Sequence, residues 1–413
     1  MAVSSAAMNH QPSVAMFVYG DAQHDSRVMR EAAAVASSGR RVLVVAHTAD
    51  GLPDMETHDE WQLVRVGARD RVRPGVVAAR PGAAGRAAWL MRYAGGLREW
   101  AGAAAGAAVR WADPHGPVIW HGHDLTGVVA AARARARRGG YLVYDSHELF
   151  MEAGTVARLP GPARRLLAHL ERRRARQADL VITVNSGIAD ELVSRYRIPS
   201  PVVVMNCPVV PDEPPHRASS PMREVLAIGD RPVLLHHGGL ADGRGIVETI
   251  DALDHLPAEV ALVVLGHGEL VPEIEARAAG RAKGRLFHHP PVTIDELPAW
   301  VAGADVGVIA FQPVEANNLL ATPNKLFECL AVGVPVVVSD FPEMRSIVDT
   351  WGVGATCDPR SPASIAEAVT RVLAQDRRKL FTACRRAATE RYSWQRQSST
   401  LLEAYDLLDG RAA

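Results

Sequence analysis

The chain has 413 residues, 48% hydrophobic and 22% charged, which is enough for two globular domains and excludes a largely disordered protein. Its net charge is zero, but residues 1–210 carry 26 Arg against 19 Asp and Glu, a net of +7, and residues 211–413 carry a net of −7. This asymmetry indicates a basic N-terminal half that meets an anionic partner. A general preference for arginine, which outnumbers lysine 43 to 3, is the alternative, but it does not explain the asymmetry.

The four cysteines lie far apart, without CxxC spacing or a pattern of histidines beside them. This favours a reducing cytoplasm and argues against structural zinc and disulfides. Residues 1–12 lack the basic and apolar segments of a secretory signal, and no apolar run reaches the length of a membrane span. We therefore expect a cytoplasmic protein, at most peripheral to the inner face of the membrane.

The first half of the chain alternates short apolar strands with helices. Residues 14–19 predict a strand, a helix with an apolar stripe from Val28 to Ala36 follows, and residues 41–46 predict the next strand. Residues 74–112, rich in Ala, Gly and Arg, predict one or two helices. Further strands are expected at residues 117–120, 141–144, 180–184 and 201–205. This order predicts a parallel, doubly wound sheet.

Polar side chains follow several of these strands. Asp25 and Arg27 come after the first strand, His121 and His123 after a later one, and His147 after the next. Alternation along an extended chain places His121 and His123 on one side. Clustered His, Asp and Glu raise a metal site as an alternative, but the spacing matches no common zinc signature, and we expect no metal. A histidine that binds sugar or transfers protons is the preferred interpretation.

A strongly basic helix is predicted at residues 164–176, with Leu166, Leu167 and Leu170 on one face. Such a helix can rest on an anionic membrane or an anionic acceptor, although a solvated amphipathic helix is the alternative. No aromatic platform or known module accompanies the arginines, so we expect no nucleic-acid partner.

Residues 207–231 contain five prolines and little periodicity, and they form the best linker candidate. The strand–helix pattern then restarts, with strands expected at residues 233–236, 260–265, 285–288, 306–310 and 335–338. Two similar α/β domains around a hinge are therefore predicted.

The second domain opens with a glycine-rich turn at residues 238–245, between a strand and a helix. Its backbone N–H groups and the helix N-terminus can receive an anion, and Arg244 adds a charged fork suited to a diphosphate. The turn matches neither the Walker loop nor the GxGxxG fingerprint, which argues against ATPase and NAD readings. The following strand ends in Gly266-His267-Gly268, at the edge where ligands bind in open α/β sheets.

The most specific segment runs from Pro323 to Asp340, and it predicts a short helix followed by a buried strand. Asn324, Lys325 and Glu328 lie at the start of this helix. Lys325 suits phosphate and Glu328 suits sugar hydroxyls; a solvated i,i+3 ion pair is the alternative.

Together these segments resemble the retaining GT-B glycosyltransferases of family 4, also called group 1 glycosyltransferases, along nearly the whole chain. The resemblance is carried by residues 25–31, 144–150, 178–184, 238–245, 266–268 and 323–335. It implies two Rossmann-like, doubly wound parallel-sheet domains that face each other across a cleft. The expected divisions are an acceptor-side domain at 1–210, a nucleotide-sugar-binding domain at 211–392, and a C-terminal helix at 393–413 that can pack back on the first domain.

The resemblance also implies roles for single residues. Glu328 is expected to bind the ribose of the donor, Arg244 its phosphates and His123 its sugar. The predicted catalytic residues are therefore His123, Arg244 and Lys325. The predicted donor-binding residues are Gly238, Gly239, Arg244, Gly268, Asn324, Lys325 and Glu328, and the acceptor side holds Asp25, Arg27 and His147. No cofactor is expected, and the co-substrate is a nucleotide-diphosphate sugar, with UDP or GDP preferred.

Two positions depart from the family pattern. Gly239 stands where the family has a phosphate-binding arginine, and Leu320 stands where it has the first glutamate of an E-x7-E motif. We expect Lys325 to supply the missing cation. A side chain among Glu315, Asn317 and Asn318 is expected to replace the missing sugar contact.

The predicted reaction transfers a sugar, with retention, from the donor to a hydroxyl acceptor in polysaccharide, glycolipid or small-molecule glycoside biosynthesis; a lipid-linked acceptor is one option. The leaving diphosphate would assist the incoming hydroxyl on the same face, so electrostatic stabilisation of phosphate charge is the main catalytic effect. Two alternatives stay open: a non-hydrolysing nucleotide-sugar 2-epimerase, and a nucleotide-sugar-binding protein without catalysis.

Overall fold

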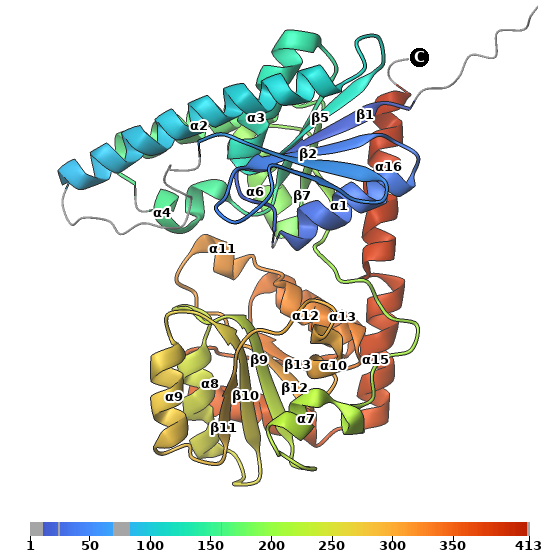
Figure 1. Cartoon of the computed structure of the whole chain (residues 1–413). Helices are drawn as coiled ribbons and strands as arrows, with labels where there is room; N and C mark the ends of the chain where they lie inside the picture. The colour runs from blue at the N-terminus through green and yellow to red at the C-terminus, as the bar shows by residue number, and fades with distance from the viewer. Residues whose placement is uncertain (1–10, 24, 69–82, 158, 411–413) are drawn as a thin grey trace, which may run out of the picture. The chain divides into compact units, whose positions relative to one another are not determined.

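The computed structural model describes residues 11–23, 25–68, 83–157 and 159–410, and the chain divides into two compact units (Figure 1). Unit 1 extends to Val204 and resumes at Ser398, and unit 2 is Met205–Gln397. Each unit is built on one largely parallel sheet with helices around it, which confirms the predicted α/β class with two Rossmann-like domains. The domain divisions at residues 210 and 392 stay a prediction.

The sheet of unit 1 has eight strands in the order β3-β4-β2-β1-β5-β6-β7-β8. All neighbours are parallel except β3, which pairs antiparallel with β4. The strands are β1 Ser13–Phe17, β2 Val42–His47, β3 Met55–Thr57, β4 Trp61–Val66, β5 Val118–His123, β6 Tyr141–Ser146, β7 Leu180–Thr183 and β8 Val202–Val203.

The helices of unit 1 cover both faces of this sheet (Figure 1). Helix α2 packs on α3, and α3 packs in turn on α5, whereas α1 and the later part of α16 lie on the other side. The expected 74–112 segment forms a single helix within the described residues. The bounds are α1 Ser26–Ser37, α2 Ala83–Trp111, α3 Asp124–Arg138, η1 Phe150–Glu152, α4 Gly154–Ala157, α5 Gly161–Gln177, α6 Ser186–Tyr196 and α16 Trp394–Asp409.

The sheet of unit 2 has six strands in the order β11-β10-β9-β12-β13-β14, all parallel. Its core is made of aliphatic side chains from the strands and from α8 and α14. The strands are β9 Val233–Gly239, β10 Ala261–His267, β11 Leu286–His289, β12 Val306–Ile309, β13 Val336–Ser339 and β14 Gly354–Cys357.

The helices of unit 2 from α8 onward follow its strands in turn, as the predicted alternation requires, and η2 and α7 precede its first strand. They are η2 Arg217–Ser219, α7 Pro221–Val225, α8 Ile246–Asp251, η3 Ala252–His255, α9 Val271–Ala279, α10 Leu297–Val301, α11 Ala316–Leu319, α12 Asn324–Ala331, α13 Pro342–Trp351, α14 Pro362–Leu373 and α15 Arg377–Glu390. None of the helices in the described part of the chain has the length and apolar character needed to cross a membrane.

Each sheet has a point where the strand order reverses, next to its first strand. In unit 1 this point lies between β1 and β5, and in unit 2 between β9 and β12. Ligands of open α/β sheets bind at the carboxyl ends of the strands around such a point. The polar segments singled out in the sequence lie at these two edges.

Candidate functional site

Unit 2 contains a cavity of about 540 Å³ at the carboxyl edge of β9, β10 and β12. The residues predicted to bind the donor line it, with one exception, Gly268. The full lining is His237, Gly238, Gly239, Arg244, Leu265, Gly266, His267, Pro291, Val292, Leu297, Phe311, Pro323, Asn324, Lys325 and Glu328. The structure thus brings together residues from 238 to 328 in one concave site.

Glycine is required at two positions of this edge by close backbone approach. A Cβ on Gly245, which has a φ of 72°, would lie 1.8 Å from the Ala310 carbonyl oxygen. A Cβ on Gly268 would lie 2.1 Å from the Leu240 carbonyl oxygen. The absence of a Cβ at Gly245 therefore allows the start of α8 to pack against the end of β12. The absence of a Cβ at Gly268 allows the loop after β10 to pack on the glycine turn.

Two cations lie over one aromatic ring in the cavity. The guanidinium carbon of Arg244 is 4.5 Å from the centroid of the Phe311 ring, and the Lys325 Nζ is 5.6 Å from it. A cation over a ring gains about 0.5–2 kcal/mol, more when water is excluded, and Phe311 is only 3% exposed. The ring therefore holds two positive groups at the place where the sequence predicts a diphosphate.

Lys325 lies at the start of α12 and is almost fully buried. Its Nζ is 3.1 Å from the His236 Nε2, on the neighbouring strand β9. Burial, reinforced by the charge of Arg244, lowers the pKa of Lys325 to about 7. Burial and the nearby Lys325 likewise hold the pKa of His236 well below its usual range. An anion bound here would relieve the repulsion between Arg244 and Lys325.

Glu328 lies one turn further along α12, and its side chain is 25% exposed. Its Oε2 is 2.8 Å from the His237 Nε2, so an imidazole N–H from β9 holds the carboxylate at the cavity wall. A carboxylate has about four acceptor positions on its two oxygens, so the hydrogen bond from His237 leaves capacity for hydroxyl donors. This is the arrangement that binding of a ribose diol needs.

The cavity also contains residues that the sequence did not single out. His237 and Phe311 each stand at the carboxyl end of a strand, and this position was the signal that could have identified them. Pro291, Val292 and Leu297 follow β11 and form an apolar wall. Nothing in their local sequence distinguishes them from ordinary loop residues.

The segment expected to replace the missing glutamate packs on the glycine turn. The side-chain amide of Asn318 donates to the carbonyl oxygen of Gln312 at 2.9 Å and to that of Gly243 at 3.4 Å. Its nitrogen is therefore used to hold the loop. The role of Glu315 and Asn317 stays a prediction.

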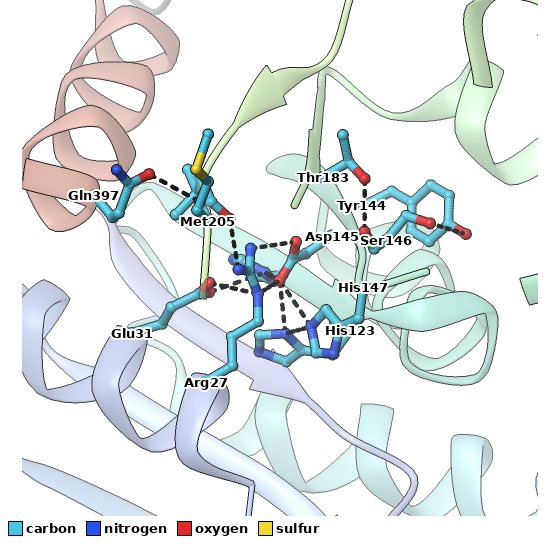
Figure 2. Close-up of polar contacts among 12 residues, drawn as sticks. Arg27, Glu31, His123, Tyr144, Asp145, Ser146, His147, Thr183, Met205 and Gln397 are labelled. Carbon is cyan, nitrogen blue, oxygen red and sulfur yellow. Dashed lines mark hydrogen bonds and ion pairs between the residues drawn. The ribbon is translucent and has the colours of Figure 1, made fainter. Parts of the chain in front are cut away.

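At the edge of the unit 1 sheet, a buried charge cluster surrounds Asp145 at the end of β6 (Figure 2). Arg27 from α1 binds both oxygens of Asp145, at 2.9 and 2.8 Å, and its Nε is 3.0 Å from Glu31. Arg27 also donates to the carbonyl oxygen of Val204 at 2.6 Å. All three side chains are at most 2% exposed, so the guanidinium is committed to the interior. The acceptor-side role of Arg27 stays a prediction, and its contacts place it in the interior beside Asp145.

Two histidines share the same oxygen of Asp145 (Figure 2). His123 Nδ1 lies 3.1 Å from it and His147 Nε2 lies 2.9 Å from it. Burial and the neighbouring His121 lower the pKa of His123 to about 3. Burial also opposes charge on His147, but Asp124 and Asp145 outweigh it and raise its pKa to about 10. At neutral pH His123 is thus neutral and His147 is a cation.

The two histidines differ in access as well as charge. The side chain of His147 is 20% exposed, whereas that of His123 is 1% exposed. The third predicted acceptor-side residue, Asp25, caps α1 by accepting from the Val28 N–H at 3.2 Å. Of the side chains expected at this edge, His147 is thus better placed than His123 or Arg27 to touch a ligand.

The cluster has the ligand types of a metal site. One atom each from Glu31, His121, His123 and Asp145 lies within 4.8 Å of the others. The guanidinium of Arg27 already binds both oxygens of Asp145, however, and supplies the positive charge that two buried carboxylates require. A metal would have to displace it, so these residues do not fit a metal ion.

Two doubly wound sheets, with a cavity that two cationic side chains line at the switch point of the second, are the architecture of the GT-B class. Comparison with protein families agrees: residues 26–213 match the family model described as Glycosyltransferase Family 4, and residues 231–375 match the one described as Glycosyl transferases group 1. The matches follow one another and cover 188 and 145 residues, most of the chain. The chain belongs to the group 1 glycosyltransferases of family 4.

Curated relatives and a solved structure are consistent with this. A D-inositol 3-phosphate glycosyltransferase of Xylanimonas cellulosilytica is 33% identical over 205 residues, 48% of this chain and 47% of the relative. A GDP-mannose-dependent alpha-(1-6)-phosphatidylinositol monomannoside mannosyltransferase of Mycolicibacterium smegmatis is 29% identical over 58% of this chain and 64% of the relative. The sucrose-phosphate synthase of Thermosynechococcus elongatus superposes with a TM-score of 0.74 at 17% identity, over 97% of this chain and 100% of that one.

The two curated relatives match this chain over only part of their length. The chain spans about half of the first relative and 64% of the second, so the activity and substrates of those proteins are not transferred by similarity alone. The structural match supports the GT-B fold. None of the three proteins is named an epimerase, so the epimerase alternative gains no support from them.

Proposed function

We propose that this protein is a retaining glycosyltransferase that moves a sugar from a nucleotide-diphosphate sugar to a hydroxyl acceptor without a metal ion. The observation that carries the proposal is the pair of cations, Arg244 and Lys325, over the Phe311 ring beside a glycine turn. Lys325 is buried and Arg244 is half-buried, so an anion placed between them would stabilise both positive charges. A diphosphate has the charge and size to do so.

The other walls of the cavity suit the rest of a nucleotide sugar. The backbone of Gly238 and Gly239 allows close approach of the phosphates, and Asn324 lies at the N-terminus of α12. Glu328, held by His237, accepts hydrogen bonds from the ribose. The apolar wall after β11 receives the base. UDP and GDP both fit this description.

Catalysis would rest on the stabilisation of the departing diphosphate. Arg244, Lys325 and backbone donors stabilise the negative charge that develops as the sugar leaves, while the acceptor hydroxyl approaches the same face. Neutral His123 and cationic His147 would act on the first-domain side, where His147 has the exposure needed to orient a hydroxyl or a phosphate of the acceptor.

The acceptor is a hydroxyl on a small polyol or on a lipid-linked glycan. This class is supported by the names of the curated relatives, whose acceptors include inositol 3-phosphate and a phosphatidylinositol mannoside. Peripheral contact with an anionic membrane, expected from the basic helix α5, is part of the same proposal.

Thermal shift against UDP-, GDP- and ADP-sugars tests donor binding, because a ligand that binds the native state raises its stability by about 2.7 kcal/mol at one hundred times Kd. The donor that binds is then incubated, radiolabelled, with and without inositol 3-phosphate or a lipid extract. A radiolabelled glycoside formed only with acceptor supports transfer. A C2-inverted nucleotide sugar would identify an epimerase, and binding without turnover a silent binding protein.

The site itself is tested by Arg244→Ala and Glu328→Ala, with Arg378→Ala on the exposed N-terminus of α15 as the matched control. Arg244→Ala should lower donor affinity and kcat together, because the charge it removes acts in both the bound state and the transition state. Glu328→Ala should weaken donor binding. Unchanged turnover and affinity in both variants would place the site elsewhere.

A further inference from the structure

One face of unit 1 carries a cluster of arginines that no carboxylate balances. It is built from three helices that pack side by side, α2, α3 and α5 (Figure 1). No ion pair joins any of these arginines to an acidic side chain within the described part of the chain. We call this surface the arginine face; its residues are Arg98, Arg110, Arg133, Arg137, Arg173 and Arg174.

The guanidinium groups of the arginine face lie close enough to repel one another. Arg110 Nη1 and Arg137 Nη1 are each 3.4 Å from the position that a Cβ on Gly106 would take, so at most 6.8 Å, twice that distance, separates them. Burial and then the charges of Arg98 and Arg137 lower the pKa of Arg133. Burial and then Arg173 lower that of Arg174. Such crowding destabilises the folded protein unless an anion compensates it.

The hydrogen bonds of these arginines do not neutralise them. Arg133 donates to the carbonyl oxygen of Arg98 at 2.5 Å, and Arg137 to that of Gly102 at 3.3 Å. Arg174 donates to the amide oxygen of Gln177. Neutral acceptors fix the directions of the guanidinium groups and leave their charge in place. The face is therefore ordered and positive before any partner arrives.

Apolar side chains accompany the charge on the same helices. Met91 on α2 and Leu166 on α5 are each 70% exposed. Each stands seven residues before an arginine of the face, Arg98 and Arg173 respectively, and so about two turns away on nearly the same side of its helix. A small apolar cavity lies between these helices, lined by Tyr93, Leu97, Leu125, Thr126, Phe150, Val156, Leu159, Leu167 and Leu170.

Arginines interleaved with exposed aliphatic side chains fit one partner better than others. A soluble polyanion would use the charges and leave Met91 and Leu166 in water. An anionic lipid surface uses both, because headgroups pair with guanidinium groups while aliphatic side chains enter the acyl boundary. We propose that the arginine face is a docking surface for a membrane with anionic headgroups.

This inference deepens the membrane contact in the proposed function, but its test needs neither donor nor acceptor. Co-sedimentation of the full chain is measured with vesicles of phosphatidylglycerol and phosphatidylcholine and with vesicles of phosphatidylcholine alone. Binding to immobilised heparin, a polyanion without an acyl boundary, is measured separately. We expect binding to the anionic vesicles, little binding to phosphatidylcholine, and loss of vesicle binding at high salt. Failure of sugar transfer would leave this result unaffected.

Two pairs of variants then assign the surface. Arg98→Glu with Arg137→Glu should lower vesicle affinity at least tenfold, whereas Arg378→Glu with Lys379→Glu, the same charge change on exposed positions of α15, should change it less than twofold. Met91→Ser with Leu166→Ser should lower vesicle affinity severalfold and leave heparin binding unchanged.

Several results would overturn the inference. One is an equal loss of vesicle affinity in the two charge-reversed variants, and another is the absence of binding to anionic vesicles. A third is binding to heparin together with serine variants whose vesicle affinity is unchanged. If the Arg98 and Arg137 reversal unfolds the protein by circular dichroism, Arg110→Gln with Arg173→Gln replaces it, because both side chains are exposed.

Discussion

At the scale of single residues, we expect Lys325 to couple donor binding to pH. Burial and the charge of Arg244 lower its pKa to about 7, and a bound diphosphate would favour the ammonium form, so donor binding should raise that pKa. Donor affinity should therefore be constant below pH 7 and fall towards tenfold per pH unit above it. At pH 7 each binding event should take up about half a proton.

Calorimetry in buffers of different ionisation enthalpy measures this uptake directly. A nucleotide sugar is the right probe, because its phosphodiester groups do not titrate near neutrality. Lys325→Arg should bind the donor without proton uptake and without the affinity loss above pH 7. A binding enthalpy in the wild type that does not depend on the buffer would show that Lys325 is charged in the empty site as well.

His237 is a positioning residue for Glu328, to which it donates a hydrogen bond at 2.8 Å. A hydrogen bond to a charged group contributes about 1.5–3 kcal/mol, so His237→Asn should weaken donor binding by roughly tenfold to a hundredfold. The specific readout is the effect of the ribose 2′-hydroxyl on affinity. In the wild type a 2′-deoxyribose donor should bind less tightly than the ribose donor, whereas in His237→Asn the two donors should bind with nearly equal affinity. His255→Asn, at an exposed position, serves as control. An undiminished ribose effect in His237→Asn would rule the role out.

At the scale of elements, sequence patterns predicted the helices and the buried parallel strands well. The strand from Val336 to Ser339 and the helix before it follow from their apolar spacing alone. Strand β4, Trp61–Val66, was missed although it pairs parallel with β2; its buried residues alternate with more exposed ones and form no continuous apolar run. Strand β3 was missed because it is a short, exposed edge strand, and β14 because Gly354–Cys357 lacks a run of β-branched residues. Local signals of this kind do not encode such edges.

The candidate site was only partly predictable for a similar reason. Residues at strand ends were identifiable because the carboxyl edge of a parallel sheet gathers them. The burial of Arg27 was not, because its partner Asp145 lies 118 residues away along the chain. Phe311 was missed too, because its ring contacts Arg244 and Lys325, which come from two other segments of the chain. Long-range pairing sets these contacts.

Helix α16 supplies a side chain to the charge cluster of unit 1. The Tyr405 hydroxyl lies 2.5 Å from His121 Nδ1, and His121 Nε2 faces Asp145 and Glu31 at 3.7 Å each. The Tyr405 hydroxyl is within hydrogen-bonding distance of Nδ1, whereas 3.7 Å is too long for a hydrogen bond between Nε2 and either carboxylate. The C-terminal helix thus places a hydroxyl within hydrogen-bonding distance of a buried histidine next to His123.

Tyr405→Phe should therefore destabilise the protein by about 1 kcal/mol, a fall in Tm of roughly 2–4 °C. It should also lower the pKa of His147, because a less ordered His121 lets Asp145 move away from it. Thermal unfolding and histidine NMR titration measure the two effects. Tyr141→Phe, on the half-buried start of β6, is the control. A Tm loss with an unchanged His147 titration would mean that Tyr405 only fills space.

At the scale of the whole molecule, each unit has its own core and its own group of polar residues at the carboxyl edge of its sheet. Proteins with more than one domain commonly unfold in more than one step. The residues proposed to bind the donor nucleotide all lie in unit 2, so UDP or GDP should stabilise that unit first. At one hundred times Kd the gain is about 2.7 kcal/mol, which raises the transition of a 200-residue unit by roughly 5–10 °C.

Differential scanning calorimetry with and without the nucleotide that binds should show this as the shift of one of two transitions. Hydrogen exchange then identifies the unit: peptides of α12 and β9 should gain protection, while peptides of β5 and β6 should change little. Lys325→Met, which removes a cation from the cavity, should abolish both the shift and the protection. Equal protection of β6 and α12 by the nucleotide alone would mean that the two units respond to it as one cooperative body, and the donor site could then not be confined to unit 2.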